Sequence, residues 1–187
     1  MSADWCNETQ LLDAAQAGNE RAFLQIYQLY RAPLFRFAWR LTTSQPAAED
    51  IVQECFAVLL ESRSFDNSRG TLRTYLFGII RNLVSRRFRL LEREADPVDE
   101  APAPVNPLSD LLNAERSALV ANAVAVLPPL QREALILFQY EGLSLEEIAT
   151  ITESDAGAIK SRLHRARESL RHLLAPLLQP GVERKSS

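Results

Sequence analysis

The side chains in this sequence that could act on a ligand are arginines and lysines, which gather in two stretches. Residues 69–93 carry seven arginines against the single acid Glu92, and residues 160–171 carry five cations against Glu168. These groups neutralise phosphates and bond to guanine edges, but they catalyse no covalent step by themselves. A polyanion would meet each basic stretch separately, so the net charge of -3 does not exclude a nucleic-acid partner.

Two helices joined by a tight turn must position the second basic stretch. Ser144 and Glu147 can form a capping box, which predicts a helix from Ser144 to Thr152, and Asp155 can cap the next helix. That next helix carries an apolar stripe formed by Ile159, Leu163, Ala166 and Leu170. Its opposite face is small near the start and basic further on, as a helix that enters the major groove requires. The sequence therefore predicts a helix-turn-helix, and a helical hairpin with a solvated basic face is the alternative.

The first basic stretch belongs to a helix that follows a polar loop. The loop spans residues 64–70, and apolar residues at helical spacing then continue from Leu72 to Phe88. Such a loop could hold an unstacked base while arginines of the helix grip the backbone of a single strand. A solvated arginine-rich face is the alternative.

Helical patterns also fill the chain before this loop. They cover residues 11–41, where Pro33 predicts a bend or a break, and a further helix opens at Ser44 and Pro46. One face of that further helix is apolar, and the other holds acids and amides, among them Glu49, Asp50, Gln53 and Glu54. The acidic face is either solvated or a docking surface for a basic partner protein.

Residues 92–107 differ in composition from the segments on either side. They hold four prolines and are rich in acidic residues, which predicts a linker without regular structure. We therefore expect an all-α fold of two small helical domains, residues 1–91 and 108–187, joined by a flexible acidic Pro-rich linker. The C-terminal domain contains the helix-turn-helix and, before it, a helix from Leu130 to Tyr140 that Gly142 can end.

Several classes of protein are excluded by what the sequence lacks. Cys6 and Cys55 are too few for a disulfide framework, and Cys55 lies on an apolar stripe that predicts a buried thiol. No Cys/His cluster suggests a metal site, and no nucleophile with a base, phosphate loop or paired acids suggests an enzyme or a cofactor. Without an apolar run of signal-peptide or membrane-spanning type, we expect a cytoplasmic location.

Longer motifs carry a family resemblance. The run from Leu127 to Leu170, with KSRLHRAR after the turn, resembles the promoter-binding C-terminal domain of bacterial extracytoplasmic-function sigma factors. Three segments look like the N-terminal domain of the same family: AEDIVQECF at 48–56, FD-x-x-x-G-x-LR-x-x-L at 65–76 and IIRNL at 79–83. The likeness covers about residues 10–174 in the family's order. It implies an alternative sigma factor that binds core RNA polymerase and directs promoter-specific transcription initiation.

The resemblance also implies roles for three sets of residues. The acidic face corresponds to the surface that docks on the clamp helices of the polymerase largest subunit: Glu49, Asp50, Gln53 and Glu54. The loop and the helix after it correspond to the part that recognises and melts the minus-ten element and holds a flipped base: Phe65, Asp66, Asn67, Ser68, Arg69, Arg73, Tyr75, Arg81, Asn82 and Arg86. The last helix corresponds to the minus-thirty-five reader: Ala158, Lys160, Ser161, Arg162, His164 and Arg165. Further implied partners are the polymerase flap, promoter DNA and an anti-sigma factor, with no metal, no small-molecule substrate and no direct membrane insertion.

The turn of the helix-turn-helix departs from the family pattern. The family usually has a glycine followed by an apolar residue where this chain has Glu153 and Ser154, which predicts a less tightly packed turn. Two other classes of protein use similar modules: an anti-sigma or adaptor protein, and a helix-turn-helix transcriptional regulator that acts without core polymerase. A receiver domain of such a regulator would alternate strands with helices, whereas residues 1–91 show only helical patterns.

Overall fold

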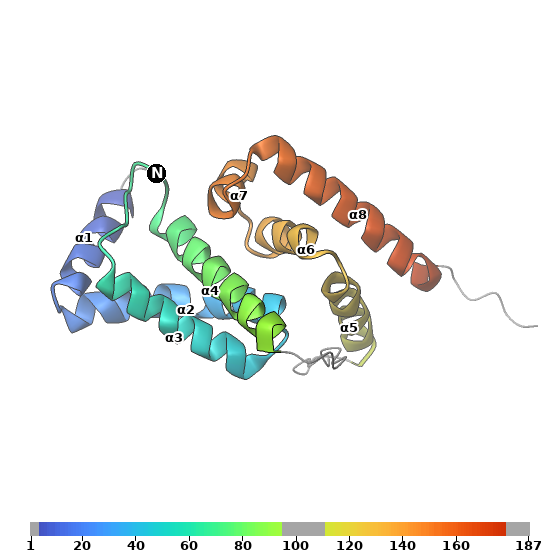
Figure 1. Cartoon of the computed structure of the whole chain (residues 1–187), viewed down its shortest axis with the longest axis horizontal. Helices are drawn as coiled ribbons and strands as arrows, with labels where there is room; N and C mark the ends of the chain where they lie inside the picture. The colour runs from blue at the N-terminus through green and yellow to red at the C-terminus, as the bar shows by residue number, and fades with distance from the viewer. Residues whose placement is uncertain (1–3, 95–110, 179–187) are drawn as a thin grey trace, which may run out of the picture.

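The computed structural model describes residues 4–94 and 111–178, and all regular structure within these two ranges is helical. The all-α class is therefore confirmed. None of the helices described is both long and apolar enough to cross a membrane. The elements, shown in Figure 1, are α1 (Asp4–Gln16), α2 (Glu20–Thr42), α3 (Gln45–Glu61), α4 (Leu72–Glu94), α5 (Leu111–Ala125), α6 (Pro129–Leu135), the π-helix η1 (Ile136–Tyr140), α7 (Leu145–Thr152) and α8 (Ala156–Leu178).

The first helical pattern is interrupted at Gly18 and not at Pro33. Gly18 has a φ of 92°, and the side chain of Asn19 then caps α2 by accepting hydrogen bonds from the backbone of Arg21 and Ala22. α2 runs from Glu20 through Pro33 to Thr42 without a break. Leu34 and Phe37 just beyond the proline are fully buried. Tertiary packing on both sides of Pro33 therefore outweighs the one helical hydrogen bond that its ring removes.

α3 and α4 complete the N-terminal half, as their apolar patterns predict. Ser44 caps α3 by accepting a hydrogen bond from the backbone N of Ala47, at 3.4 Å. Phe37 of α2 and Phe77 of α4 are both fully buried, with ring centroids 5.1 Å apart in an edge-to-face arrangement. Cys55 of α3 is also fully buried, which confirms the predicted buried thiol. These contacts fix α4 against the two helices that precede it.

The helix expected at residues 130–140 changes type halfway. It is α-helical to Leu135, and η1 then continues with wider turns, closed by a hydrogen bond from the backbone N of Glu141 to the carbonyl of Ile136 at 3.2 Å. Gly142, with a φ of 65°, ends the segment as predicted. The wider turns keep Ile136 and Leu137 in the core while Glu141 reaches the N-terminal half of the chain.

The two halves of the chain pack against each other. α7 lies beside α4 in Figure 1, and the buried residues of both halves form one continuous hydrophobic cluster. The predicted linker begins at residue 92, whereas α4 continues to Glu94, with an exposed last part that includes Phe88, Leu90 and Leu91. Residues 95–107 lie outside the described ranges. The described part of the C-terminal half begins with α5 at Leu111.

Candidate nucleic-acid interface

The helix-turn-helix is formed by α7 and α8. Ser144 Oγ accepts a hydrogen bond from the backbone N of Glu147 at 3.1 Å, and Glu147 Oε2 accepts one from the backbone N of Ser144 at 2.8 Å. This is the predicted capping box. Asp155 Oδ1 accepts from the backbone N of Ala158 at 2.8 Å and so caps α8. Two capped helices meet across the turn formed by Glu153, Ser154 and Asp155.

The turn needs a residue in the left-handed backbone region. Glu153 occupies that region, with a φ of 50° and a ψ of 44°, and its backbone N–H bonds to carbonyl oxygens at the end of α7. Glycine adopts this conformation without strain, whereas other L-residues lose energy in it. This chain therefore has Glu153, where the family usually has glycine, at the one residue of the turn with a positive φ.

The outer surface of α8 carries most of the residues predicted to read the minus-thirty-five element. Its inner stripe is buried at Ile159, Leu163 and Ala166, with Leu170 partly buried, as predicted. Lys160, Ser161, His164 and Arg165 are exposed, and Ala158 is half-buried. Ser161 Oγ donates to the carbonyl of Gly157 at 3.0 Å, and His164 Nε2 lies 3.6 Å from Glu168 Oε2. The exposed set forms one continuous small-then-basic surface.

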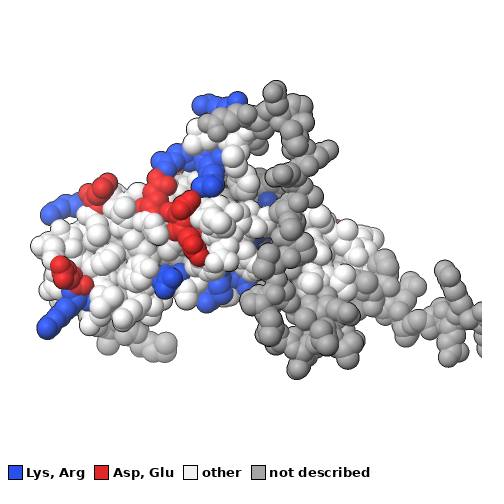
Figure 2. Space-filling model, turned by 90° about the horizontal axis from the view of Figure 1, so that it is seen from below, with Lys and Arg blue, Asp and Glu red and all other residues white. Residues whose placement is uncertain are grey.

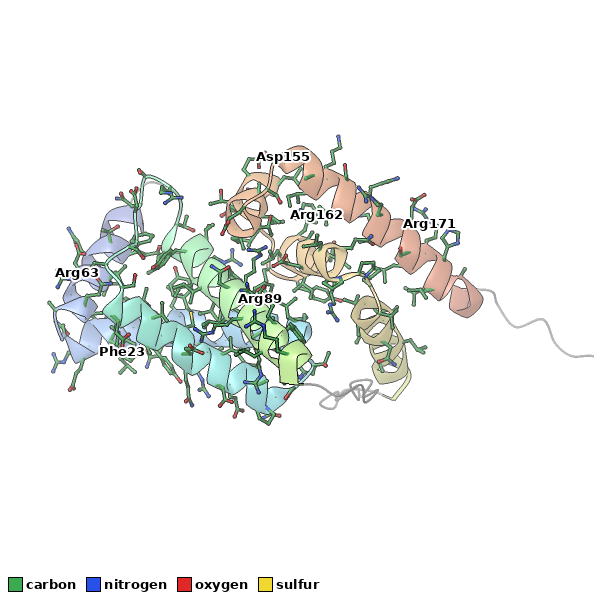
Figure 3. The ribbon with its side chains drawn as sticks, in the orientation of Figure 1. Phe23, Arg63, Arg89, Asp155, Arg162 and Arg171 are labelled. Carbon is green, nitrogen blue, oxygen red and sulfur yellow. The ribbon has the colours of Figure 1, made fainter. Side chains whose placement is uncertain are left out.

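Arg162 lies apart from that surface. Its side chain is half-buried and donates a hydrogen bond from Nη2 to Ser154 Oγ at 2.9 Å. It also lies close enough to Glu133 of α6 to act on that carboxylate electrostatically. Figure 3 shows Arg162 on the side of α8 that faces α6, with Asp155 at the N-terminal end of the helix. In this conformation Arg162 braces the turn.

The loop between α3 and α4 is ordered by its own side chains. Asp66 Oδ1 accepts from the backbone N and from Oγ of Ser68, at 2.9 and 2.7 Å. These hydrogen bonds hold the pKa of the Asp66 carboxyl below its usual value. Phe65 lies 5.5 Å from Tyr75 of α4, centroid to centroid, at an angle of 54°. The predicted polar residues Asp66, Asn67, Ser68 and Arg69 are all exposed beside this aromatic pair.

The residues of α4 predicted to contact the minus-ten element lie on two different sides of the helix. Asn82 and Arg86 are exposed, and Arg86 forms an ion pair with Glu54 of α3. Arg73 and Arg81 are half-buried and turn toward the C-terminal half of the chain. The structure thus brings the loop and half-buried Tyr75 together and leaves Asn82 and Arg86 exposed further along α4, whereas Arg73 and Arg81 contact the C-terminal half.

The predicted docking residues lie together on the exposed face of α3. Glu49, Asp50, Gln53 and Glu54 are all exposed. Two of the acids have basic neighbours on α4, because Arg86 pairs with Glu54 and Arg87 Nη1 lies 3.8 Å from Asp50 Oδ2. Figure 2, which views the molecule from below, shows a band of acidic side chains bordered by basic ones. The surface is strongly charged, and its local field is partly neutralised by α4.

Three charged residues between the halves were not singled out from the sequence: Arg40, Glu133 and Glu141. Glu133 and Glu141 are buried, with 7% and 6% of their surface exposed. Burial raises the pKa of both carboxyls despite the arginines nearby. Glu133 lies among the apolar positions of its helix. Because a carboxylate is rarely buried without a partner, this position could have predicted a paired cation from the sequence.

Comparisons with known proteins agree with this architecture. The family model described as Sigma-70 region 2 matches residues 26–94, and the one described as Sigma-70, region 4 matches residues 117–170. The chain is 32% identical to the RNA polymerase sigma-H factor of Pseudomonas aeruginosa, over 92% of this chain and 96% of that protein. It is 34% identical to the ECF RNA polymerase sigma factor SigL of Mycobacterium tuberculosis, over 91% of this chain and 96% of SigL.

A solved structure is similar as well. It is the sigma factor RpoE of Bartonella quintana, crystallised in complex with the anti-sigma factor NepR. The match has a TM-score of 0.65 and 33% identity, and it covers 82% of this chain and 96% of that one. With full-length relatives above 30% identity and sigma-70 regions matched in both halves, this chain belongs to the extracytoplasmic-function (ECF) family of RNA polymerase sigma factors.

Proposed function

We propose that this sigma factor docks on core RNA polymerase through α3 and reads the two promoter elements with α4 and α8. As a member of its family, the chain is an alternative sigma factor that directs promoter-specific transcription initiation. Such factors act by binding, and we assign no covalent step to this chain. The observation that carries the assignment of roles is the capped helix-turn-helix, with its exposed small-then-basic face on α8.

The minus-thirty-five element meets the outer surface of α8. Ala158 and Ser161 near the start of the helix allow close approach to base edges, and Arg165 supplies a fork of donors for guanine. Lys160 and His164 flank them on the phosphate side. Arg162 supports this reader from inside the turn, because its guanidinium bonds to Ser154.

The minus-ten element meets the loop of residues 65–69 and the exposed side of α4. Phe65 and Tyr75 offer an aromatic surface beside a polar loop, which suits a base taken out of the stack. Asn82 and Arg86 lie further along α4, where they can contact the strand. Arg73 and Arg81 belong to the same interface once the C-terminal half has moved away from them.

Core polymerase binds the face of Glu49, Asp50, Gln53 and Glu54. The test is charge reversal of Asp50→Lys with Glu54→Lys, followed by titration of labelled chain with core polymerase. We expect affinity to fall by at least about tenfold per reversed charge, since like charges would then face each other. The matched control reverses Asp13 and Glu20, two exposed acids on α1 and α2. If both double variants lose the same affinity for core polymerase, α3 is not the docking surface.

The reader helix has its own test in promoter-specific transcription with core polymerase. Replacing Arg165 by Ala should lower output about 5- to 150-fold, because a good base contact contributes about 1 to 3 kcal/mol of discrimination. Arg171→Ala, an exposed arginine further along α8, serves as the control and should show a smaller loss that is uniform across promoters. If Arg165→Ala transcribes at the wild-type level, Arg165 does not read the promoter.

An anti-sigma factor is the remaining proposed partner. The similar RpoE chain was solved bound to one, and this chain matches most of its length. Co-purification of the tagged chain from its native cells should recover a protein that blocks binding to core polymerase. A regulator that works without polymerase is not favoured, because both halves match sigma-70 regions.

A further inference from the structure

The loop between α3 and α4 is tied to α1 at the point where α3 ends. Gln16, the last residue of α1, donates hydrogen bonds from its side-chain Nε2 to the backbone carbonyls of Leu59 and Ser62, both at 2.8 Å. The last carbonyls of a helix have no partner within it, so this amide both satisfies the end of α3 and fixes where the loop leaves it. Figure 1 shows the loop running from α3 past α1 before it enters α4. The two bonds join residues that are 43 and 46 positions apart in sequence.

From Ser62 the hydrogen bonds continue to Tyr75 in the first turn of α4. Ser62 Oγ lies 2.5 Å from Ser64 Oγ, and Ser64 Oγ lies 2.7 Å from the Tyr75 hydroxyl oxygen. The hydroxyl oxygens of Ser62 and Tyr75 are 3.5 Å apart, which closes the group into a triangle. Each hydroxyl can both donate and accept, so the three can satisfy one another. We call the bonds from Gln16 through the two serines to Tyr75 the loop brace.

The loop brace fixes the orientation of the Tyr75 ring relative to Phe65. Both rings are half-buried and pack on the hydrophobic core, with their centroids 5.5 Å apart. Packing alone restrains such a ring weakly, because its second side-chain torsion has a broad minimum. A hydrogen bond at the hydroxyl restrains the end of the ring that is farthest from the backbone. Thr71 Oγ1 accepts a hydrogen bond from the backbone N of Thr74 at 3.0 Å, which fixes the start of the helix that carries the ring.

We infer that Gln16 is a positioning residue for the minus-ten interface: through the loop brace it holds Phe65 and Tyr75 in the arrangement that accepts an unstacked base, without contacting DNA itself. The inference rests on the proposed role of the loop and names a residue outside the loop that determines its geometry. Two rings that are already arranged bind a base more tightly, because less ordering remains to be done on binding. Without the brace, only the fraction of chains that hold the rings in this arrangement is competent to bind.

A purely structural role for Gln16 makes a different prediction. A weaker fold would reduce every activity of the chain in proportion, including binding to core polymerase. A positioning role affects only the step in which a base enters the loop, so it changes the preference among bases. The test uses Gln16→Leu, which keeps a similar size but removes both donors, and Ser64→Ala, which breaks the brace at its middle. Gln10→Leu, the same change at an exposed position of α1, is the matched control.

The loop brace itself is measured by hydrogen exchange in the full chain without polymerase. The amides of residues 62–69 should exchange about 2- to 10-fold faster in Gln16→Leu than in the wild type, the factor that an ordinary hydrogen bond contributes. Amides of α2, and all amides of Gln10→Leu, should exchange at the wild-type rate. Ser64 is exposed, so Ser64→Ala keeps the test decisive if circular dichroism shows that Gln16→Leu has lost helix. Unchanged exchange in the loop of both variants would overturn the inference.

The effect on base capture is measured with holoenzyme assembled from core polymerase and each variant. The probes are single-stranded oligonucleotides that span the minus-ten region of a promoter transcribed by wild-type holoenzyme, with each of the four bases placed at each position. The ratio of affinities between the best and the worst base at the captured position should fall about 2- to 10-fold in Gln16→Leu and in Ser64→Ala. The double variant should fall no further, since both changes break the same series of bonds. Affinity for core polymerase should stay at the wild-type value throughout.

Three outcomes contradict the positioning role. They are an unchanged base preference in both single variants, a double variant whose loss equals the product of the two single losses, and a loss of affinity for core polymerase in proportion to the loss of preference. If wild-type holoenzyme shows no base preference at any minus-ten position, the proposed role of the loop fails and the positioning role fails with it. Hydrogen exchange still decides in that case whether the loop brace restrains the loop.

Discussion

Replacement of Glu153 by Gly should stabilise the helix-turn-helix. The backbone conformation of Glu153 gives both the direction and the magnitude of the expected change in free energy. Glu153 has a φ of 50° and a ψ of 44°, a left-handed conformation that costs an L-residue roughly 1 to 2 kcal/mol. Glycine removes this strain but loses about 0.5 to 1 kcal/mol through the greater freedom of the unfolded chain. The midpoints of these two ranges differ by about 0.75 kcal/mol, so we expect a gain on the order of 0.5 to 1 kcal/mol.

The carboxylate itself should contribute little. Glu153 lies just after the C-terminal end of α7 and just before the N-terminal end of α8. A negative charge is unfavourable at the first position and favourable at the second, so the two helix-dipole contributions largely cancel. The variants Glu153→Ala and Glu153→Asn separate backbone from charge, because alanine keeps the strain without the charge and asparagine tolerates the left-handed region.

Hydrogen exchange of the backbone amides in α7 and α8 is the appropriate assay. A gain of about 0.5 to 1 kcal/mol slows exchange by local opening about 2- to 5-fold, and amides of α2 serve as the internal reference. The expected order of protection is Gly, then Asn, with Ala close to the wild-type Glu. If Ala protects these amides as well as Gly does, charge and not backbone strain is the cause, and the reasoning is refuted.

Three further predictions concern stability and reactivity. Phe37→Ala should lower the free energy of unfolding by about 3 to 5 kcal/mol, because it empties a fully buried site against Phe77; a urea titration that shows less than 1 kcal/mol, on the order of a surface substitution, would contradict this. Burial raises the pKa of the Cys55 thiol to about 12, so iodoacetamide at pH 8 should label it only after unfolding, as peptide mass spectrometry can determine. Burial also raises the pKa of Glu133 above 4.5, so its contribution to stability is fully present below pH 4.5 and is lost as pH rises through the folded-state pKa. Glu133→Gln should flatten that part of the curve of stability against pH, and a curve parallel to the wild type would refute the assignment.

Features that depend on neighbours in sequence were predictable. The capping box of Ser144 and Glu147, the caps at Ser44 and Asp155, and the buried stripe of α8 all involve groups within a few residues of each other. Their geometry follows from helix periodicity and from unsatisfied backbone donors, which any helix start has. The predictions of where α3, α7 and α8 start, and of which residues they bury, were accordingly correct.

Features that depend on distant partners were not predictable. Pro33 lies within a helix because α3 and α4 pack against α2, and no local signal reports that packing. The π-helical turns of η1 have the same origin, since they serve a contact between Glu141 and Arg40 that spans about half of the sequence. Glu133 and Arg81 likewise meet only when the two halves fold together. Periodicity alone leaves the partner of a buried charge undetermined.

Arginine shows this limit most clearly, because its chemistry suits phosphate, base edge and carboxylate equally well. Arg162 and Arg165 are three positions apart on α8, yet the first braces the turn through Ser154 and the second faces outward. Arg81 and Arg86 on α4 differ likewise, one held by buried Glu133 and the other by exposed Glu54. An arginine held by a buried carboxylate becomes available to DNA only through a conformational change, whereas one held by an exposed carboxylate exchanges partners locally. In this sigma factor, the burial of the carboxylate therefore separates an arginine engaged between the two halves of the chain, Arg81, from one paired at the surface, Arg86.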